Sequence, residues 1–554
     1  MPLPLLAAIV IGALTAGYFL YGKLIARQYR LDDTRRCPAE EFNDGDDYVP
    51  AKPFYLLGQH FSAIAAAGPI VGPIAACMAF GWLPCVLWIG LGVIFIGAVH
   101  DFSALVASVR HKAQSVAGIV RENLGTRAWL AILAFIWIAL VYVIVAFADV
   151  TAGTFAGQIE ELEGKDVAFS KGGAVAFAST AYLLLAVVMG FIQKKLSPPL
   201  WLVTLIFVPA TLGVVWLGTK ASTLLVFPHG SWVGIIMAYC FVASLLPVWV
   251  LLQPRGYLGG FVLYIALAVG VVGLFFGGFT IQQPAFKGWG AGKTPDDHLF
   301  PFLFVTIACG ACSGFHGLVC SGTTSKQISK ESDCKPVGYG AMLLEAFVAL
   351  IALGTILIAA NPKGGPGAIY GDGMGEFLTV IIGKQHKAFA TVFGAMVFST
   401  FVFDTLDVAT RLGRIILQEL TNRKGKAAAA VATLIMTGVP FVLLAASKAG
   451  SWRAYWTLFG TSNQLLAGLT FLGITVWLKR TGRPYWFTLW PMVFVLTITV
   501  WSLVVQGVAA FREKLGFNPV TINGVTAVLL GALTALLLVE SVAALRRPSE
   551  ARPA

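Results

Sequence analysis

The sequence predicts an all-α polytopic membrane protein with about fifteen transmembrane helices, the N-terminus outside and the C-terminus in the cytoplasm. Composition is the first observation: 57% of the 554 residues are hydrophobic and only 12% are charged. The mean hydropathy of +0.80 is far too high for a soluble protein. The other two observations are the spacing of long apolar runs and the uneven placement of lysine and arginine among the loops.

A helix needs about 20 apolar residues to cross the hydrocarbon core of a bilayer. Runs of that length are separated by charged or Pro- and Gly-rich breaks, and no gap between them is suited to a folded soluble domain. The predicted spans lie near residues 3–22, 60–80, 82–108, 128–150, 173–193, 198–218, 231–252, 256–279, 300–321, 337–360, 387–410, 427–446, 454–478, 485–507 and 522–545.

Lysine and arginine orient these spans. Of the 39 such residues, 27 fall in the loops and tail assigned to the cytoplasm and 12 in the rest of the chain. This is the positive-inside pattern, and it predicts a multi-pass protein of the cell inner membrane. The net charge of +12 is therefore a topology signal and indicates no nucleic-acid partner.

The second predicted span is interrupted. Gly68-Pro69 and Gly72-Pro73 lie at mid-membrane depth, and each proline removes a backbone donor. Two such steps four residues apart predict local unwinding, and the freed backbone groups need partners from protein, water or a ligand. A kink healed by neighbouring helices is the alternative, but paired breaks of this kind are typical of binding sites.

The ninth predicted span contains a second interruption, rich in glycine, hydroxyl and thiol groups. Cys309, Cys312 and His316 follow one helical face, so a soft-metal site is one interpretation. A straight helix spaces these side chains too widely for more than two neighbours to share an ion. We favour a packed face on which His316 handles protons, with no bound metal.

Pro247, flanked by Ser244 and Trp249, predicts a third break, in the seventh span. The second and seventh spans are five helices apart and cross in opposite directions. This arithmetic predicts two inverted five-helix repeats, residues 60–218 and 231–416, with a first helix and cytoplasmic loop in 1–59 and peripheral helices and tail in 427–554. The alternative pairs the second span with the ninth.

Charged groups inside a bilayer are costly and are candidates for function. His100 and Asp101, adjacent in the third span, form a candidate proton couple, unless Asp101 only caps or pairs near the cytoplasmic end. Asp149 and Glu345 are single acids whose neighbours indicate no role. The amides Asn463 and Gln464 favour interhelical contact over ligand contact.

The eleventh span carries two acids with different expected roles. Asp407 and Arg411 are four residues apart, which predicts a structural ion pair. Asp404, followed by Thr405, has no opposite charge three or four residues away and is a candidate for ion coupling.

Several of these blocks resemble the carbon starvation protein A family, a match that covers about residues 50–470. The blocks occur in the family's order, and their number makes the resemblance specific. They are Gly58–Phe61, Ala67–Pro73, Ala98–Phe102, Leu246–Arg255, Ser313–His316, Thr405–Arg414 and Gly460–Leu466. One departure is Gln59, which stands where family members often have a second histidine beside His60.

The resemblance implies a peptide or pyruvate permease of the amino acid-polyamine-organocation superfamily, whose core is the inverted five-helix repeat. It also implies proton-coupled uptake of a small carboxylate-bearing nutrient, pyruvate or a short peptide, in the response to carbon starvation. The partners implied are this small molecule and the bilayer. The helices after residue 416 are a candidate surface for a homodimer or a scaffold role.

The resulting hypothesis is alternating access around a midplane site, in a protein that is not an enzyme and carries no cofactor beyond a coupling cation. Substrate-binding candidates are Gly68, Pro69, Gly72, Pro73, Ser244, Pro247, Trp249, Ser313 and His316; coupling-ion candidates are His60, His100, Asp101, Ser321, Thr323, Asp404 and Thr405. Protons are favoured over sodium. A sodium-coupled carrier, a nutrient sensor and a membrane metalloenzyme are the alternatives.

Overall fold

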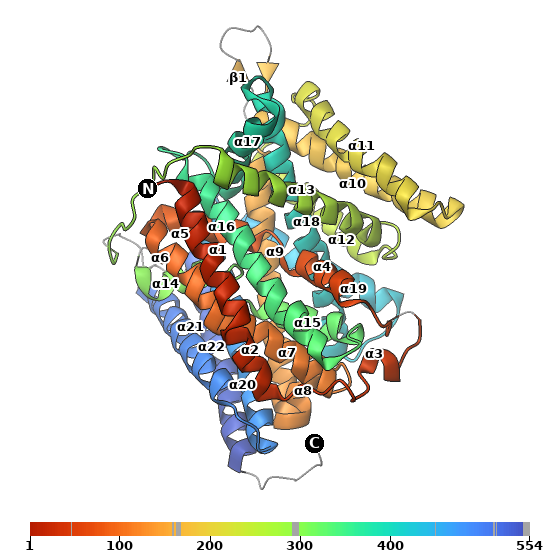
Figure 1. The fold of residues 1–554 in the computed structure, drawn as a ribbon, viewed down its shortest axis with the longest axis vertical. Coiled ribbons are helices and arrows are strands. Elements are labelled where there is room, and N and C mark those ends of the chain that lie inside the picture. Colours follow the sequence, from red (N-terminus) through yellow and green to blue (C-terminus); the bar gives the residue numbers. More distant parts are fainter. Residues whose placement is uncertain are drawn as a thin grey trace. The chain divides into compact units, whose positions relative to one another are not determined.

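The computed structural model consists almost entirely of helices (Figure 1). It describes residues 1–45, 47–157, 160–161, 168–290, 298–448, 450–512, 516 and 518–546. Two short strands, β1 (Glu160–Glu161) and β2 (Ala168–Phe169), pair antiparallel with Glu160 opposite Phe169.

The first half of the chain contains α1 (Leu3–Phe19), α2 (Tyr21–Tyr29), α3 (Pro38–Glu41), α4 (Pro53–Ile64), α5 (Gly68–Phe80), α6 (Trp82–Leu87), the π-helix η1 (Trp88–Gly97), α7 (Ala98–Arg110), α8 (Val116–Leu124), α9 (Thr126–Phe155), α10 (Lys171–Leu196), α11 (Leu200–Lys220), α12 (His229–Leu245) and α13 (Leu252–Phe276). The second half contains α14 (Leu299–Thr306), α15 (Gly314–Gly322), the short helices η3 (Thr324–Lys326), η4 (Glu331–Asp333) and η5 (Lys335–Gly340), then α16 (Ala341–Leu357), α17 (Pro366–Ile382), η6 (Lys384–His386), α18 (Lys387–Leu420), α19 (Lys426–Ala445), α20 (Trp452–Arg480), α21 (Trp486–Arg512) and α22 (Pro519–Arg546).

Within the described residues, eleven helical segments are long and apolar enough to cross a bilayer, and the bent pair α4–α5 adds a twelfth. The chain is therefore a multi-pass helical membrane protein, as predicted. The remaining three predicted spans correspond to α12, which is short, to α14 with α15, which are separated, and to α20, which carries the polar run Thr461–Gln464. The total of fifteen stays a prediction.

The chain divides into two compact units, each built from separate stretches of sequence. Unit 1 comprises Met1–Ala7, Leu140–Gln283 and Ile351–Trp456, and unit 2 comprises Ala8–Ala139, Pro284–Leu350 and Thr457–Ala554.

In unit 1, α18 is the central helix, and α10, α11, α12, α13, α17 and α19 all pack against it. Helices α10 and α11 also lie side by side (Figure 1). The sequence predicted no span at α17, which contains Asp372, Glu376 and several glycines. It packs closely on α18 because Gly371 lies against Ala395 and leaves no room for a side chain.

In unit 2, α7 packs against α8, α15, η1, η5 and α21, and α5 packs against α6 and α14. The break predicted near Gly68 is present: α4 and α5 meet at an angle of 48°. The unwound residues are Ala65–Ala67, just before the first Gly-Pro step, because Pro69 fits the first turn of α5. Pro73 lies within α5, so the second step does not unwind the helix.

Two other predicted breaks are present. Residues 307–313 separate α14 from α15 in unit 2, and residues 246–251 separate α12 from α13 in unit 1. Each lies where glycine or proline weakens the helix.

Gly72 gives a direct test of how closely α5 approaches α14. A Cβ atom there would lie 2.6 Å from the backbone oxygen of Thr306. We expect Gly72→Ala to cost about 1–3 kcal/mol through overpacking, measured as a lower midpoint of thermal unfolding in detergent. Gly531→Ala on α22 is the matched control, because nothing lies within 4 Å of its added Cβ. Equal midpoints for the two variants would contradict this packing.

Candidate functional site

The two interrupted segments of unit 2 lie against each other. A Cβ at Gly68 would collide with the side chain of Cys309, and a Cβ at Gly310 would lie 3.5 Å from Cα of Pro69. The start of α5 and the break before α15 are therefore in direct contact. Of the residues predicted to bind substrate, Gly68, Pro69, Gly72, Pro73, Ser313 and His316 belong to this unit.

Asn463, on α20, holds the second break in place. Its Oδ1 accepts from the backbone N–H of Phe315 at 2.9 Å, and its Nδ2 donates to Ser313 Oγ at 3.0 Å and to Cys309 Sγ at 3.2 Å. These bonds satisfy polar groups at the N-terminus of α15 that the break leaves without helical partners.

Asn463→Leu is expected to destabilise the protein by about 1–2 kcal/mol, since it removes this cap and leaves buried polar groups unpaired. Asn463→Asp, which keeps the acceptor for Phe315, is the matched variant and is expected to lose less. The midpoint of thermal unfolding measures both. If leucine is tolerated as well as aspartate, the cap does not stabilise the break.

Four titratable residues of unit 2 form a continuous buried chain. Asp101 on α7 has Oδ1 at 2.7 Å from His100 Nδ1 and Oδ2 at 2.9 Å from His316 Nδ1 on α15. His316 Nε2 lies 3.2 Å from Glu345 Oε2 on α16. No side chain of the four is more than 1% exposed. We call His100, Asp101, His316 and Glu345 the Asp101 network.

Within the part of the chain that the structure describes, each end of the Asp101 network has a polar atom without a hydrogen-bond partner. Among the described residues, His100 Nε2 has no hydrogen-bond partner, and neither carboxylate oxygen of Glu345 has one. A buried polar atom without a partner is costly, so such atoms call for a functional explanation. A protonated imidazole donates from both nitrogens and a neutral one from a single nitrogen, so the network can hold a variable number of protons.

His60 lies close to this network but is not part of it. Its Nδ1 is 2.8 Å from Thr324 Oγ1, and its Nε2 is 3.8 Å from Cys320 Sγ. The Cys320 thiol in turn donates to the backbone oxygen of Asp101 at 3.5 Å. His60 is 1% exposed.

The other candidates of the ninth span have different surroundings. Ser321 Oγ donates to the carbonyl of Gly317 at 2.7 Å and accepts from the Val116 N–H at 3.1 Å, whereas Thr323 is exposed. Cys309 and Cys320 already contact Asn463 and Asp101. Over the described residues, no group of three His, Cys, Asp or Glu side chains is arranged to hold a metal ion.

A second buried charge cluster lies in unit 1, and it corrects one prediction. Arg255 on α13 contacts Asp404 Oδ1 at 2.5 Å through Nη2 and Asp407 Oδ2 at 2.8 Å through Nη1. The predicted pair of Asp407 with Arg411 is wrong, because Asp407 pairs with Arg255, whereas the coupling role of Asp404 stays a prediction. The reason is tertiary: α13 packs on α18 and brings a cation that the spacing along one helix could not indicate.

Arg411 and Arg414 instead cap the C-terminus of α12. Arg411 Nη2 donates to the carbonyls of Ala243 at 3.1 Å and Leu246 at 2.8 Å, and Arg414 Nη1 donates to that of Ser244 at 2.7 Å. These carbonyls are unsatisfied at the end of a helix, where cations are favourable. The two guanidinium groups thus stabilise the interruption between α12 and α13.

The remaining candidates also lie in unit 1. Ser244 Oγ is 3.4 Å from Thr433 Oγ1, and Thr405 Oγ1 donates to the carbonyl of Phe401 at 3.0 Å. Trp249, beyond Pro247, packs edge-on against Phe191 with ring centroids 5.6 Å apart.

Three residues of these sites had no role in the sequence-based hypothesis: Glu345, Arg255 and Tyr239. Tyr239 donates its hydroxyl to Asp407 Oδ2 at 2.8 Å. Glu345 and Arg255 are charges within apolar runs, which is itself a signal of function. Their partners lie on other helices. The sequence therefore indicates that these charges are unusual but cannot predict which residues they contact.

The fold and the Asp101 network define the class of protein first: a multi-pass membrane protein with interrupted helices and a chain of titratable groups buried inside it. The family follows from comparison. The model of the family "Carbon starvation protein CstA" matches residues 3–363 and 358–502, and the chain belongs to this family.

Curated relatives extend over most of the chain. It is 32% identical to the peptide transporter CstA of Mycobacterium tuberculosis, over 91% of this chain and 74% of the relative. It is 31% identical to the peptide transporter CstA of Bacillus subtilis, over 96% and 94%. It is 30% identical to the pyruvate/proton symporter BtsT of Escherichia coli, over 90% and 81%. These relatives are named as transporters, so this is a family of transporters and not of enzymes.

Proposed function

We propose that the protein is a proton-coupled secondary transporter that imports a small carboxylate-bearing nutrient, pyruvate or a short peptide, by alternating access. The observation that carries this proposal is the Asp101 network, which lies beside two interrupted helices. Hydrogen bonds join His100, Asp101 and His316, and the carboxylate of Glu345 lies 3.2 Å from His316 Nε2. Intramembrane chains of Asp, Glu and His are characteristic of proton relays.

The network couples protons to helix positions because its members come from three helices. Asp101 is on α7, His316 on α15 and Glu345 on α16. A proton on His316 lets both ring nitrogens donate, one toward each carboxylate, and so strengthens the contact of α15 with its neighbours. Loss of that proton leaves one donor and two carboxylates, which weakens the contact. The proton count thus biases the packing of α15.

The substrate carboxylate binds at the N-termini of the interrupted helices in this proposal. Backbone amides and the helix dipole favour an anion there. The start of α5, at Gly68 and Pro69, and the start of α15, after Ser313, are the two candidates of unit 2. Segment Ser244–Trp249 of unit 1 stays a candidate for substrate binding.

The inverted repeat also stays a proposal. The boundaries 60–218 and 231–416 stay part of this proposal. The second and ninth predicted spans are both interrupted, and they contact each other at Gly68 and Cys309 and at Gly72 and Thr306. Transporters with inverted repeats bind substrate between two discontinuous helices, one from each repeat. Inner-membrane location, the N-out and C-in orientation, a homodimer and a role in carbon starvation are part of the same proposal.

Uptake into proteoliposomes tests this function. Labelled pyruvate and, separately, a labelled dipeptide are offered under an imposed proton gradient and then under a sodium gradient. We expect accumulation of one substrate under the proton gradient, abolished by a protonophore. Accumulation only under the sodium gradient would mean that sodium, and not the proton, is the coupling ion. No accumulation of either substrate, with folded and oriented protein, would contradict the assignment and favour a sensor.

A further inference from the structure

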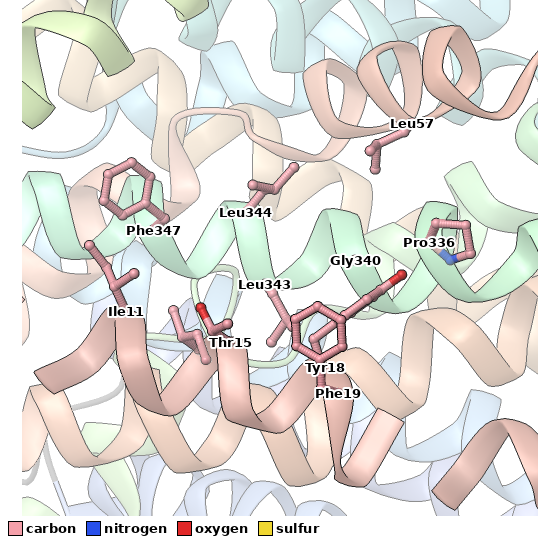
Figure 2. A pocket seen from close by; sticks show the side chains of 11 residues that line it. Ile11, Thr15, Tyr18, Phe19, Leu57, Pro336, Gly340, Leu343, Leu344 and Phe347 are labelled. Atoms are coloured by element: carbon pink, nitrogen blue, oxygen red, sulfur yellow. The ribbon is translucent and has the colours of Figure 1, made fainter. Parts of the chain in front are cut away.

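An apolar groove opens on unit 2 between α1, α4 and the helix formed by η5 and α16 (Figure 2). Its volume is about 400 Å³, within the range of ligand sites. Figure 2 shows Ile11, Thr15 and Phe19 on one wall, Leu343 and Leu344 on the other, and Leu57 above them. Phe19 is 63% exposed and Leu344 is 40% exposed, so the groove is not closed by the protein itself.

One end of the groove is positively charged. Tyr18 lines the groove, and Lys335 Nζ lies 4.2 Å from the centroid of its ring. Lys23 is exposed on α2, and α2 packs against η5, the helix that carries Lys335. The nearby acid Glu331 does not neutralise this pair, because Arg110 holds it at 2.8 Å. Among the described residues, neither lysine has an ion-pair partner.

We propose that this groove binds an anionic phospholipid, with an acyl chain between α1 and α16 and the phosphate between Lys23 and Lys335. The apolar walls suit an acyl chain. Two cations on neighbouring helices at the polar end suit a negative headgroup, and basic sites at the ends of membrane helices bind such lipids. A second copy of this chain or an apolar peptide would leave the lysine charges unpaired. The proposal is independent of the transported substrate.

The identity and retention of lipids bound to the purified protein test this inference. Native mass spectrometry compares retention of phosphatidylglycerol and phosphatidylethanolamine by the parent protein, a Lys23→Gln/Lys335→Gln variant and a Thr15→Trp variant that fills the groove. We expect the parent to prefer phosphatidylglycerol. Each lysine is expected to contribute about fivefold to the apparent affinity, so the double variant is expected to lose about 25-fold. Thr15→Trp is expected to reduce retention of both lipids at this site.

Lys424→Gln/Lys426→Gln, which removes two exposed lysines from the loop before α19 and the start of that helix, is the matched control for charge. It is expected to retain phosphatidylglycerol like the parent. The proposal is overturned if the parent retains both lipids equally, or if the double lysine variant keeps the parent's preference. It is also overturned if Thr15→Trp converts a dimer to a monomer without changing lipid retention, because the groove then holds a second copy.

Discussion

Asp101→Asn is expected to reduce proton-driven accumulation of substrate to the level of protein-free vesicles. Asp101 is the centre of the buried network, with an imidazole on each carboxylate oxygen. Asparagine keeps the shape of the side chain but cannot take up a proton, so the relay between His100 and His316 is interrupted. Exchange of labelled for unlabelled substrate across the membrane needs no net proton movement and is expected to persist.

Accumulation and exchange are measured in the same proteoliposome preparation. Asp372→Asn is the control, because Asp372 is an exposed acid on α17 whose contact with Lys171 lies at the surface. It is expected to accumulate substrate like the parent. Undiminished accumulation by Asp101→Asn would show that the Asp101 network does not couple protons to transport. Loss of both accumulation and exchange, with an unchanged unfolding midpoint, would place Asp101 in substrate binding.

The second large effect is the expected loss of stability when Arg255 is replaced. Arg255→Gln is expected to cost about 3–5 kcal/mol, because it leaves the carboxylate of Asp407 buried without its cation. The Asp407 side chain is 3% exposed, whereas that of Asp404 is 34% exposed and can be hydrated. Asp407→Asn added to Arg255→Gln is therefore expected to recover most of the loss, because it removes the buried negative charge and keeps an acceptor for Tyr239.

Thermal unfolding in detergent measures these variants against Arg414→Gln, which removes a partly buried guanidinium from the end of α12. The Arg414 variant is expected to lose about 1.5–3 kcal/mol, the cost of a lost hydrogen bond from a charged group. If the double variant is as unstable as Arg255→Gln, the packing of the Arg255 side chain outweighs its charge.

The breaks could be predicted from the sequence because glycine and proline weaken a helix at their own positions. Gly68-Pro69 weakens a helix whatever surrounds it, and the bend lies just before it, at Ala65–Ala67. The structure shows why Pro73 is different: once α5 begins at Gly68, Pro73 lies within its second turn. Helix α17 was missed because its glycines and acids resemble a loop, although the glycines allow its close packing on α18.

Pairing between distant helices could not be predicted in the same way. His100 and Asp101 are neighbours in sequence and were linked, whereas Asp101 and His316 are 215 residues apart. Asp407 was assigned to Arg411 by helical spacing, yet α13 supplies Arg255. Interactions along one helix are worth only about 0.2–0.5 kcal/mol, so a tertiary partner in a buried setting readily replaces them.

The measurement that tests the central claim most directly is proton entry on addition of substrate. Proteoliposomes loaded with a pH-sensitive dye receive pyruvate or a dipeptide without any imposed gradient. The Asp101 network as proton carrier predicts acidification of the lumen that requires substrate and is absent in Asp101→Asn. Substrate entry with no change of lumenal pH, or equal acidification by the variant, would contradict proton coupling through this network.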